Sequence, residues 1–282
     1  MNAEQLKKKL DAIPNIPTLP AIALKVNSML MNPNTSMREL SDLIINDQAI
    51  VSNLLRLVNS AFYGFGSQID SAHRAIMVLG IETVRNAIIS VSVIPAFSTN
   101  HAGGDFSLSA FWQHSIAVAV VSRKLARHLA GEIPETCFTA GLLHDIGKII
   151  IARHLSADSS PILDLEHQGM SGCEAEKAIL SLDHAEIGGY LAHKWHLPDN
   201  LMQAIATHHT PQRRVAGHNL AAVVHAADAI VNNAHMMENP QTIGDIDHAH
   251  FTDLKILIET APAWFDEIEP EITAAYSFFG IE

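Results

Sequence analysis

The sequence predicts an all-α protein, and three observations lead to this fold class. Residues 36–39 (Ser-Met-Arg-Glu) form a capping-box pattern, and apolar residues follow it at helical spacing at Leu40, Leu43 and Ile44. The regular alternation of apolar and polar residues that is typical of strands is not found along the chain. Glycine and proline residues separate the apolar segments, as expected for a succession of helices.

Four helices are expected before residue 98. One follows the capping box, and the next begins after Asn46 or Asp47, either of which can cap it. A third is expected over residues 71–79 and a fourth over residues 81–94, where Pro95 should end it because proline lacks a backbone N–H.

A polar, glycine-containing stretch at residues 98–107 is predicted to be a linker to the rest of the chain. Further helices are expected beyond it, over residues 108–130, 135–152, 173–181, 184–195, 199–209, 218–233 and 250–259. One or two more should follow Pro262. The expected units are therefore an N-terminal helical part (1–98), a second helical bundle (99–234) and C-terminal helices (235–282) that pack on the bundle.

The composition indicates a globular chain with an acidic charge balance. Hydrophobic residues make up 48% and charged residues 17% of the sequence, and the formal net charge is −12. This charge predicts no nucleic-acid partner, because binding to a phosphate backbone depends on a basic surface. The two cysteines lack CxxC spacing, and neither a signal peptide nor a membrane-spanning segment is recognisable. A cytoplasmic protein without a membrane partner is expected.

The segment at residues 141–148 (Gly-Leu-Leu-His-Asp-Ile-Gly-Lys) carries the strongest chemical signal. An apolar run is interrupted by an imidazole, a carboxylate and an ammonium group at His144, Asp145 and Lys148. Burying such groups without partners costs several kcal/mol. A divalent cation held by neutral imidazole and carboxylate is a simple compensation.

Other predicted helices can supply further nitrogen and oxygen ligands to such a cation. The candidates are His114, His184, His208, His209 and Asp228. This ligand set suits Fe, Mn, Zn, Ni or Co better than Ca. A histidine taken singly is more often a satisfied or exposed residue than a ligand. The remaining histidines are interpreted in that way, and His225 is intermediate because it shares a helix face with Asp228.

The order of these residues resembles the HD superfamily of metal-dependent phosphohydrolases, and His-Asp-Ile-Gly-Lys is the most specific part of the match. The N-terminal part resembles the HDOD family, the HD-related output domains of bacterial signalling proteins. The motifs that carry this second resemblance are Leu19-Pro20, residues 47–50, residues 54–63, Ala75-Ile76 and Leu79-Gly80. The two resemblances together cover residues 13–232. They imply an HD-type helical bundle preceded by an N-terminal HDOD subdomain, with Arg56 and Asn59 hydrogen-bonding the two parts together.

The resemblance further implies a site for two divalent transition metals. The first would be held by His114, His144, Asp145 and Asp228. Asp145 would bridge to the second, which takes His184, His208 and His209. The catalytic candidates are Asp145 and Lys148; the lysine would neutralise phosphate charge, or alternatively interact only with the helix dipole. The implied activity is hydrolysis of a nucleotide or cyclic-nucleotide phosphoester.

The alternative function is a catalytically silent output or scaffold module that binds signalling proteins, as implied for HDOD relatives that have lost their ligands. Every ligand position that can be aligned is filled in this chain. It departs from the cyclic-dinucleotide phosphodiesterases of the superfamily, because Thr210-Pro211-Gln212 replaces their Glu and Gly-Tyr-Pro motif and Ala110 replaces a third-metal glutamate. These departures disfavour cyclic-di-GMP as the substrate.

Overall fold

The computed structural model describes residues 3–13, 16, 18–32, 34–60, 68–98, 106–129, 131–155, 158–211, 220–233 and 252–281. Every regular element in these ranges is a helix, which confirms the all-α prediction. None of the helices in these ranges combines the length and the apolar character needed to cross a membrane.

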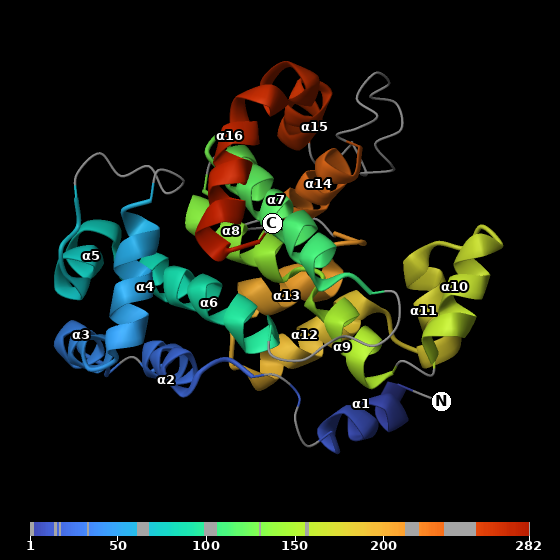
Figure 1. Ribbon diagram of the computed structural model, residues 1–282, viewed down its shortest axis with the longest axis horizontal. Helices are drawn as coiled ribbons and strands as arrows, with labels where there is room; N and C mark the ends of the chain where they lie inside the picture. The colour runs from blue at the N-terminus through green and yellow to red at the C-terminus, as the bar shows by residue number, and fades with distance from the viewer. Residues whose placement is uncertain are drawn as a thin grey trace.

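Five helices of the N-terminal region lie together on one side of the molecule (Figure 1): α2 (Ala21–Leu30), α3 (Met37–Ile45), α4 (Gln48–Val58), α5 (Ala72–Leu79) and α6 (Ile81–Ser98). The predicted capping box at α3 is confirmed, since Ser36 and Glu39 satisfy each other's backbone N–H groups. Asp47 caps α4 by accepting a hydrogen bond from the backbone N–H of Ile50. Helix α2 was not predicted from the sequence.

Helix α6 continues to Ser98, so the prediction that Pro95 ends this helix is wrong. Pro95 lies in the last turn, where the missing N–H removes only one backbone hydrogen bond. Two contacts hold this turn in place. The ring of Phe97 is fully buried and meets the ring of Trp195 edge-on, with 5.8 Å between the ring centroids. The guanidinium group of Arg153 donates a hydrogen bond to the carbonyl of Phe97.

The centre of the molecule is built from six helices: α7 (Leu108–Ala126), α8 (Pro134–Leu143), α9 (Ile146–His154), α12 (His184–Lys194), α13 (Asp199–Thr207) and α14 (Leu220–Asn233). Helix α7 packs against α8 and α14, and α12 packs against α13 and α9. The single helix expected over residues 135–152 is wrong. The chain turns at His144 and Asp145, so α8 and α9 are separate helices.

The remaining helices surround this centre (Figure 1): α1 (Ala3–Asp11), α10 (Ser159–His167), α11 (Gly172–Leu180), α15 (Thr252–Glu259) and α16 (Ala261–Phe279). Helix α1 contacts α12, where Asp11 accepts a hydrogen bond from Tyr190 and pairs with Lys194. Helix α16 packs on α7, and the buried Arg123 pairs with Glu271 at 3.1 Å. Helices α1 and α10 were not predicted.

Two residues of the HDOD-like motif have other roles than expected. The side chain of Asn59 exchanges two hydrogen bonds of 2.7 Å with the backbone of Ile69, which joins the end of α4 to the segment before α5. The guanidinium group of Arg56 lies 4.8 Å from the centroid of the Phe278 ring on α16. Among the described residues, neither side chain hydrogen-bonds the central helices, so that expectation is wrong. The motif residues 61–63 and residues 99–105 of the predicted linker (98–107) lie outside the described residues.

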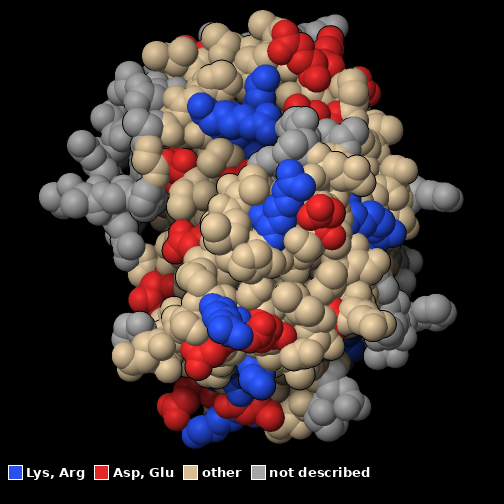
Figure 2. Space-filling view, turned by 90° about the vertical axis from the view of Figure 1, so that its left-hand side faces the viewer, with Lys and Arg blue, Asp and Glu red and all other residues tan. Residues whose placement is uncertain are grey.

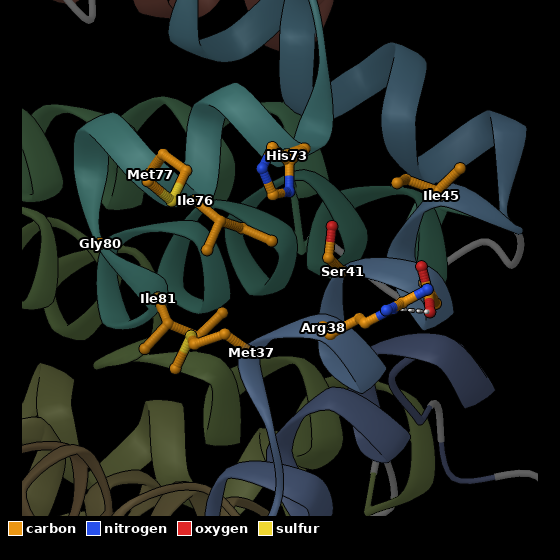
Figure 3. Close-up of a pocket in the computed structure, with 10 residues that line it drawn as sticks. Met37, Arg38, Ser41, Ile45, His73, Ile76, Met77, Gly80 and Ile81 are labelled. Carbon is orange, nitrogen blue, oxygen red and sulfur yellow. Dashed lines mark ion pairs between the residues drawn. The ribbon is translucent and has the colours of Figure 1, made fainter.

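A groove of about 740 Å³ opens between α3, α5 and the start of α6. Met37, Ile45 and Met77 line it and are 52%, 49% and 74% exposed. Figure 3 shows an apolar cluster, including Met77 and Ile81, at one end of the groove, and Ser41, Arg38 and Ile45 toward the other. The side of the molecule that carries α3 and α5 faces the viewer in Figure 2, where small clusters of both charges are separated by uncharged residues.

Candidate metal centre

Most of the predicted ligands lie at the ends of helices rather than in their middle. His144 follows the last residue of α8, and Asp145 directly precedes α9. His184 is the first residue of α12, and His208 follows the last residue of α13. The turns between these helices therefore bring ligands from distant parts of the sequence together. Only His114 on α7 and Asp228 on α14 come from within a helix.

The first turn of α9 rests directly on the first turn of α12. A Cβ atom on Gly147 would lie only 2.0 Å from the carbonyl oxygen of His184. Glycine at this position therefore allows the two helices to approach closely. This approach brings Asp145, two residues before Gly147, to His184, with 3.0 Å between Asp145 Oδ1 and His184 Nε2.

The candidate ligands form two groups that share Asp145. In one group, ligand atoms of Asp145, His184, His208 and His209 all lie within 4.8 Å of one another. In the other, the same holds for His114, His144 and Asp145. Asp228 belongs spatially to the second group, because its Oδ1 lies 3.1 Å from His114 Nε2 and 3.8 Å from His144 Nε2.

The orientation of each of three imidazole rings is fixed by a hydrogen bond from its Nδ1 atom. His144 Nδ1 lies 2.7 Å from the carbonyl oxygen of Gly141, and His208 Nδ1 lies 2.8 Å from that of Ile205. His184 Nδ1 lies 2.7 Å from a carboxylate oxygen of Glu176. Because these oxygens can only accept, each Nδ1 donates, and the Nε2 lone pair of the neutral ring faces the centre of the site.

The buried polar atoms at the centre provide a test of whether a metal fits this site. Among the described residues, His144 Nε2, His208 Nε2 and Asp145 Oδ1 are buried without a hydrogen-bond partner. The Nε2 atoms of His209 and His184 lie 2.8 Å apart, which is a hydrogen bond only if one of the two carries a proton. Lone pairs and a carboxylate gathered in this way repel one another unless a cation lies among them. The donor set therefore fits divalent metal ions.

Burial, the carboxylate of Asp145 and the neighbouring imidazoles together set the pKa shifts at the site. Burial alone would lower the pKa of His184, but the carboxylate of Asp145 outweighs it and raises the pKa to about 9. Burial also acts to lower the pKa values of His144 and Lys148, and Asp145 again raises both. His209, which is buried beside two other imidazoles, has its pKa lowered to about 3. The position beside Asp145 thus favours positive charge, whether it is carried by a proton or by a metal.

The site is closed on one side and open on the other. The side chains of Asp145 and His144 are 3% and 0% exposed. Those of His114 and Lys148 are 24% and 40% exposed. The ammonium group of Lys148 lies 2.6 Å from Asp145 Oδ2, so this lysine is part of the site. The exposed part of the site is therefore at His114 and Lys148.

The structure brings all the predicted site residues together: His114, His144, Asp145, Lys148, His184, His208, His209 and Asp228. His225 is half-buried on α14 and belongs to neither ligand group. The residues His101, His218, His235, His248 and His250 lie outside the described part of the chain. The sequence reasoning missed Glu176, because one glutamate in an amphipathic helix carries no signal of its own.

Comparison with solved structures shows a shared fold. A protein from Shewanella amazonensis SB2B, provisionally assigned as a phosphohydrolase, is 24% identical with a TM-score of 0.74, and the match covers 99% of this chain and 98% of that one. An HDOD domain protein of unknown function from Geobacter sulfurreducens is 22% identical with a TM-score of 0.74, over 98% and 97% of the two chains.

Comparison with curated sequences finds further relatives. An uncharacterized protein of Treponema pallidum is 25% identical over 201 residues, which cover 71% of this chain and 38% of that protein. Ribonuclease Y of Lactobacillus gasseri is 30% identical over 161 residues, which cover 57% and 23%. The matched region thus spans less than half the length of these relatives. The HDOD domain family itself matches residues 16–211. The chain belongs to the HDOD domain family.

Proposed function

We propose that this protein binds two divalent transition-metal ions and hydrolyses a phosphoester bond of a nucleotide or cyclic nucleotide. The observation that carries the proposal is the orientation of three imidazole rings. Their Nδ1 atoms donate to fixed acceptors, and their Nε2 atoms converge on a buried carboxylate, Asp145. This is the arrangement expected of metal-ligating histidines.

Two sets of residues would hold the metals, and they share one carboxylate. His114, His144, Asp145 and Asp228 would hold the first ion. Asp145, His184, His208 and His209 would hold the second. Metal ions bound in such a pair supply a water molecule of lowered pKa and polarise phosphoryl oxygens.

The protein's own groups contribute binding and charge. Lys148 stays protonated at neutral pH because Asp145 raises its pKa against the effect of burial. Its ammonium group lies at the open side of the site, where it can pair with a phosphoryl oxygen of the substrate. The buried side of the site, at His144 and His208, keeps bulk water from the carboxylate.

The family resemblance and the site together suggest which substrates should be tested. The family resemblance and the donor set support phosphoester hydrolysis, and the match to a protein named Ribonuclease Y adds short RNA to the phosphodiesters that should be tested. The net charge of −12 favours small nucleotides over long nucleic acids, because the chain has little basic surface to neutralise a phosphate backbone.

The test is elemental analysis of the purified protein beside two variants. We expect about two transition-metal ions per chain in the wild type, loss of both in Asp145→Ala, and no change in Asp164→Ala, which removes an exposed carboxylate on α10. The metal-loaded wild type should then hydrolyse at least one member of a panel of nucleotides, cyclic nucleotides, dinucleotides and short RNA. Full metal content in Asp145→Ala would disprove the bridging role.

A second candidate function is a signalling module without catalysis. It is favoured by the apolar groove beside α3 and α5, whose exposed methionines are unusual for a surface with no binding role (Figure 3). A wild-type protein that is folded, free of metal and unable to take up added Mn²⁺ would favour this function over the first.

A further inference from the structure

Glu176, on α11, is buried against the first residue of α12. One of its carboxylate oxygens accepts two hydrogen bonds from His184, one from the backbone N–H and one from Nδ1, both at 2.7 Å. The side chains of Glu176 and His184 are 9% and 3% exposed. In the described part of the chain, no lysine or arginine forms an ion pair with Glu176. Its hydrogen-bond partner among these residues is His184.

The position of each histidine in its helix explains why only His184 needs a carboxylate. His144 and His208 follow the last residues of α8 and α13, where backbone carbonyls lack helical partners. Each donates its Nδ1 proton to the carbonyl three residues earlier. His184 begins a helix, and the backbone groups left free there are N–H donors. An acceptor for its Nδ1 must come from a side chain, and Glu176 supplies it.

With Glu176 included, each of the two ligand groups has two carboxylates. Both groups share Asp145, and the group of His114 and His144 contains a second carboxylate, Asp228. The group of His184 contains no second carboxylate among its ligands. Glu176 provides a second carboxylate on the Nδ1 side of the imidazole, where it makes Nε2 a stronger electron-pair donor to a metal.

We propose that Glu176 is a positioning residue that orients His184 and sets the affinity of the second metal position alone. The proposal rests on the proposed function, since it requires that His184 ligates a metal. Removing an outer partner of a ligating histidine lowers metal affinity by about 10- to 100-fold. The loss should fall on one of the two ions, because Glu176 forms its hydrogen bonds with His184 and none with His114, His144 or Asp228.

The experiment compares Glu176→Gln with Glu186→Gln in metal-stripped protein titrated with Mn²⁺ by calorimetry. Glutamine keeps the size of the side chain and an acceptor oxygen, so the fold should be retained. Glu186 lies at the same helix start, where it caps α12 without contacting the imidazole. We expect one of two Mn²⁺ ions to bind about 10- to 100-fold more weakly in Glu176→Gln. Both ions should bind normally in Glu186→Gln.

A second pair of variants identifies which of the two metal positions loses affinity. In Asp228→Ala, which removes a ligand of the first position only, one ion should remain, and adding Glu176→Gln should weaken that ion. Unchanged binding in both Glu176→Gln proteins would overturn the proposal while the proposed function stands. Equal loss of both ions together with a lower melting temperature of the metal-free protein would make Glu176 merely structural. Failure of the wild type to bind Mn²⁺ would overturn the proposed function itself.

Discussion

The contact between α9 and α12 predicts a large effect of the substitution Gly147→Ala. The added Cβ would lie 2.0 Å from the carbonyl oxygen of His184, whereas an ordinary contact begins at 3.4 Å, so the two atoms must separate by about 1.4 Å. Both atoms belong to helix backbones or are fixed to them, and neither can move alone. Overpacking of this kind costs about 1–3 kcal/mol, and more where the backbone cannot adjust.

The alanine also contributes a favourable term, since it is a better helix former than glycine by about 0.5–1 kcal/mol. We therefore expect a net loss of about 2 kcal/mol in the free energy of unfolding, and a melting temperature lower by about 4–8 °C. Because the shift separates Asp145 from His184, metal content should fall as well. Urea unfolding followed by circular dichroism measures the first effect, and elemental analysis measures the second.

Gly172→Ala is the matched control, because Gly172 also lies in the first turn of a helix. The Cβ added there would meet only the end of the flexible Glu166 side chain, at 2.9 Å. This variant should be as stable as the wild type or slightly more stable, and it should keep its metal. If Gly147→Ala unfolds at the same urea concentration as Gly172→Ala, the close approach of α9 and α12 does not determine the geometry of the site.

Two further predictions concern other parts of the fold. Burial, helped by the carboxylates of Asp183 and Glu176, raises the pKa of the Cys173 thiol to about 12. The thiol should thus stay protonated as the pH rises through 8 and 9. Its labelling by a disulfide reagent at pH 8 should be about three orders of magnitude slower than that of a free thiol of pKa about 8.5. Fast labelling in the folded protein would contradict this. Asn59→Ala removes both hydrogen bonds to Ile69. It should lower the free energy of unfolding by about 2 kcal/mol without changing metal content. A variant as stable as the wild type, or one that loses metal, would count against the local role of Asn59.

The ligands could be predicted because polar residues are conspicuous in apolar helices. His144 and Asp145 interrupt a run of buried leucine and isoleucine residues, and Asp228 lies among alanine and valine. Such positions require a partner wherever the helices pack, so the sequence alone marks them as candidates. The division into two groups came from the family resemblance, and the positions of the side chains agree with it.

What could not be predicted depends on contacts between helices. Glu176 lies between Glu174 and Lys177, both of which belong to an exposed, charged pattern, and only the packing of α11 against α12 buries it. The break between α8 and α9 has no proline and no glycine at the turn, and apolar residues continue through it. The sequence carries no local signal for this break, and the contact of α9 with α12 at Gly147 is seen only in the folded structure.

The location of ligands in the turns between helices bears on how such a protein can change over evolutionary time. His144, Asp145 and His208 occupy positions where one helix has ended or the next has not begun. The apolar faces that hold the helices together lie elsewhere in the sequence. If the proposed function holds, substitutions in these turns would abolish metal binding while the helices keep the same packing. Descendants of one ancestor can in this way share a scaffold and differ in whether they carry out any chemistry at all.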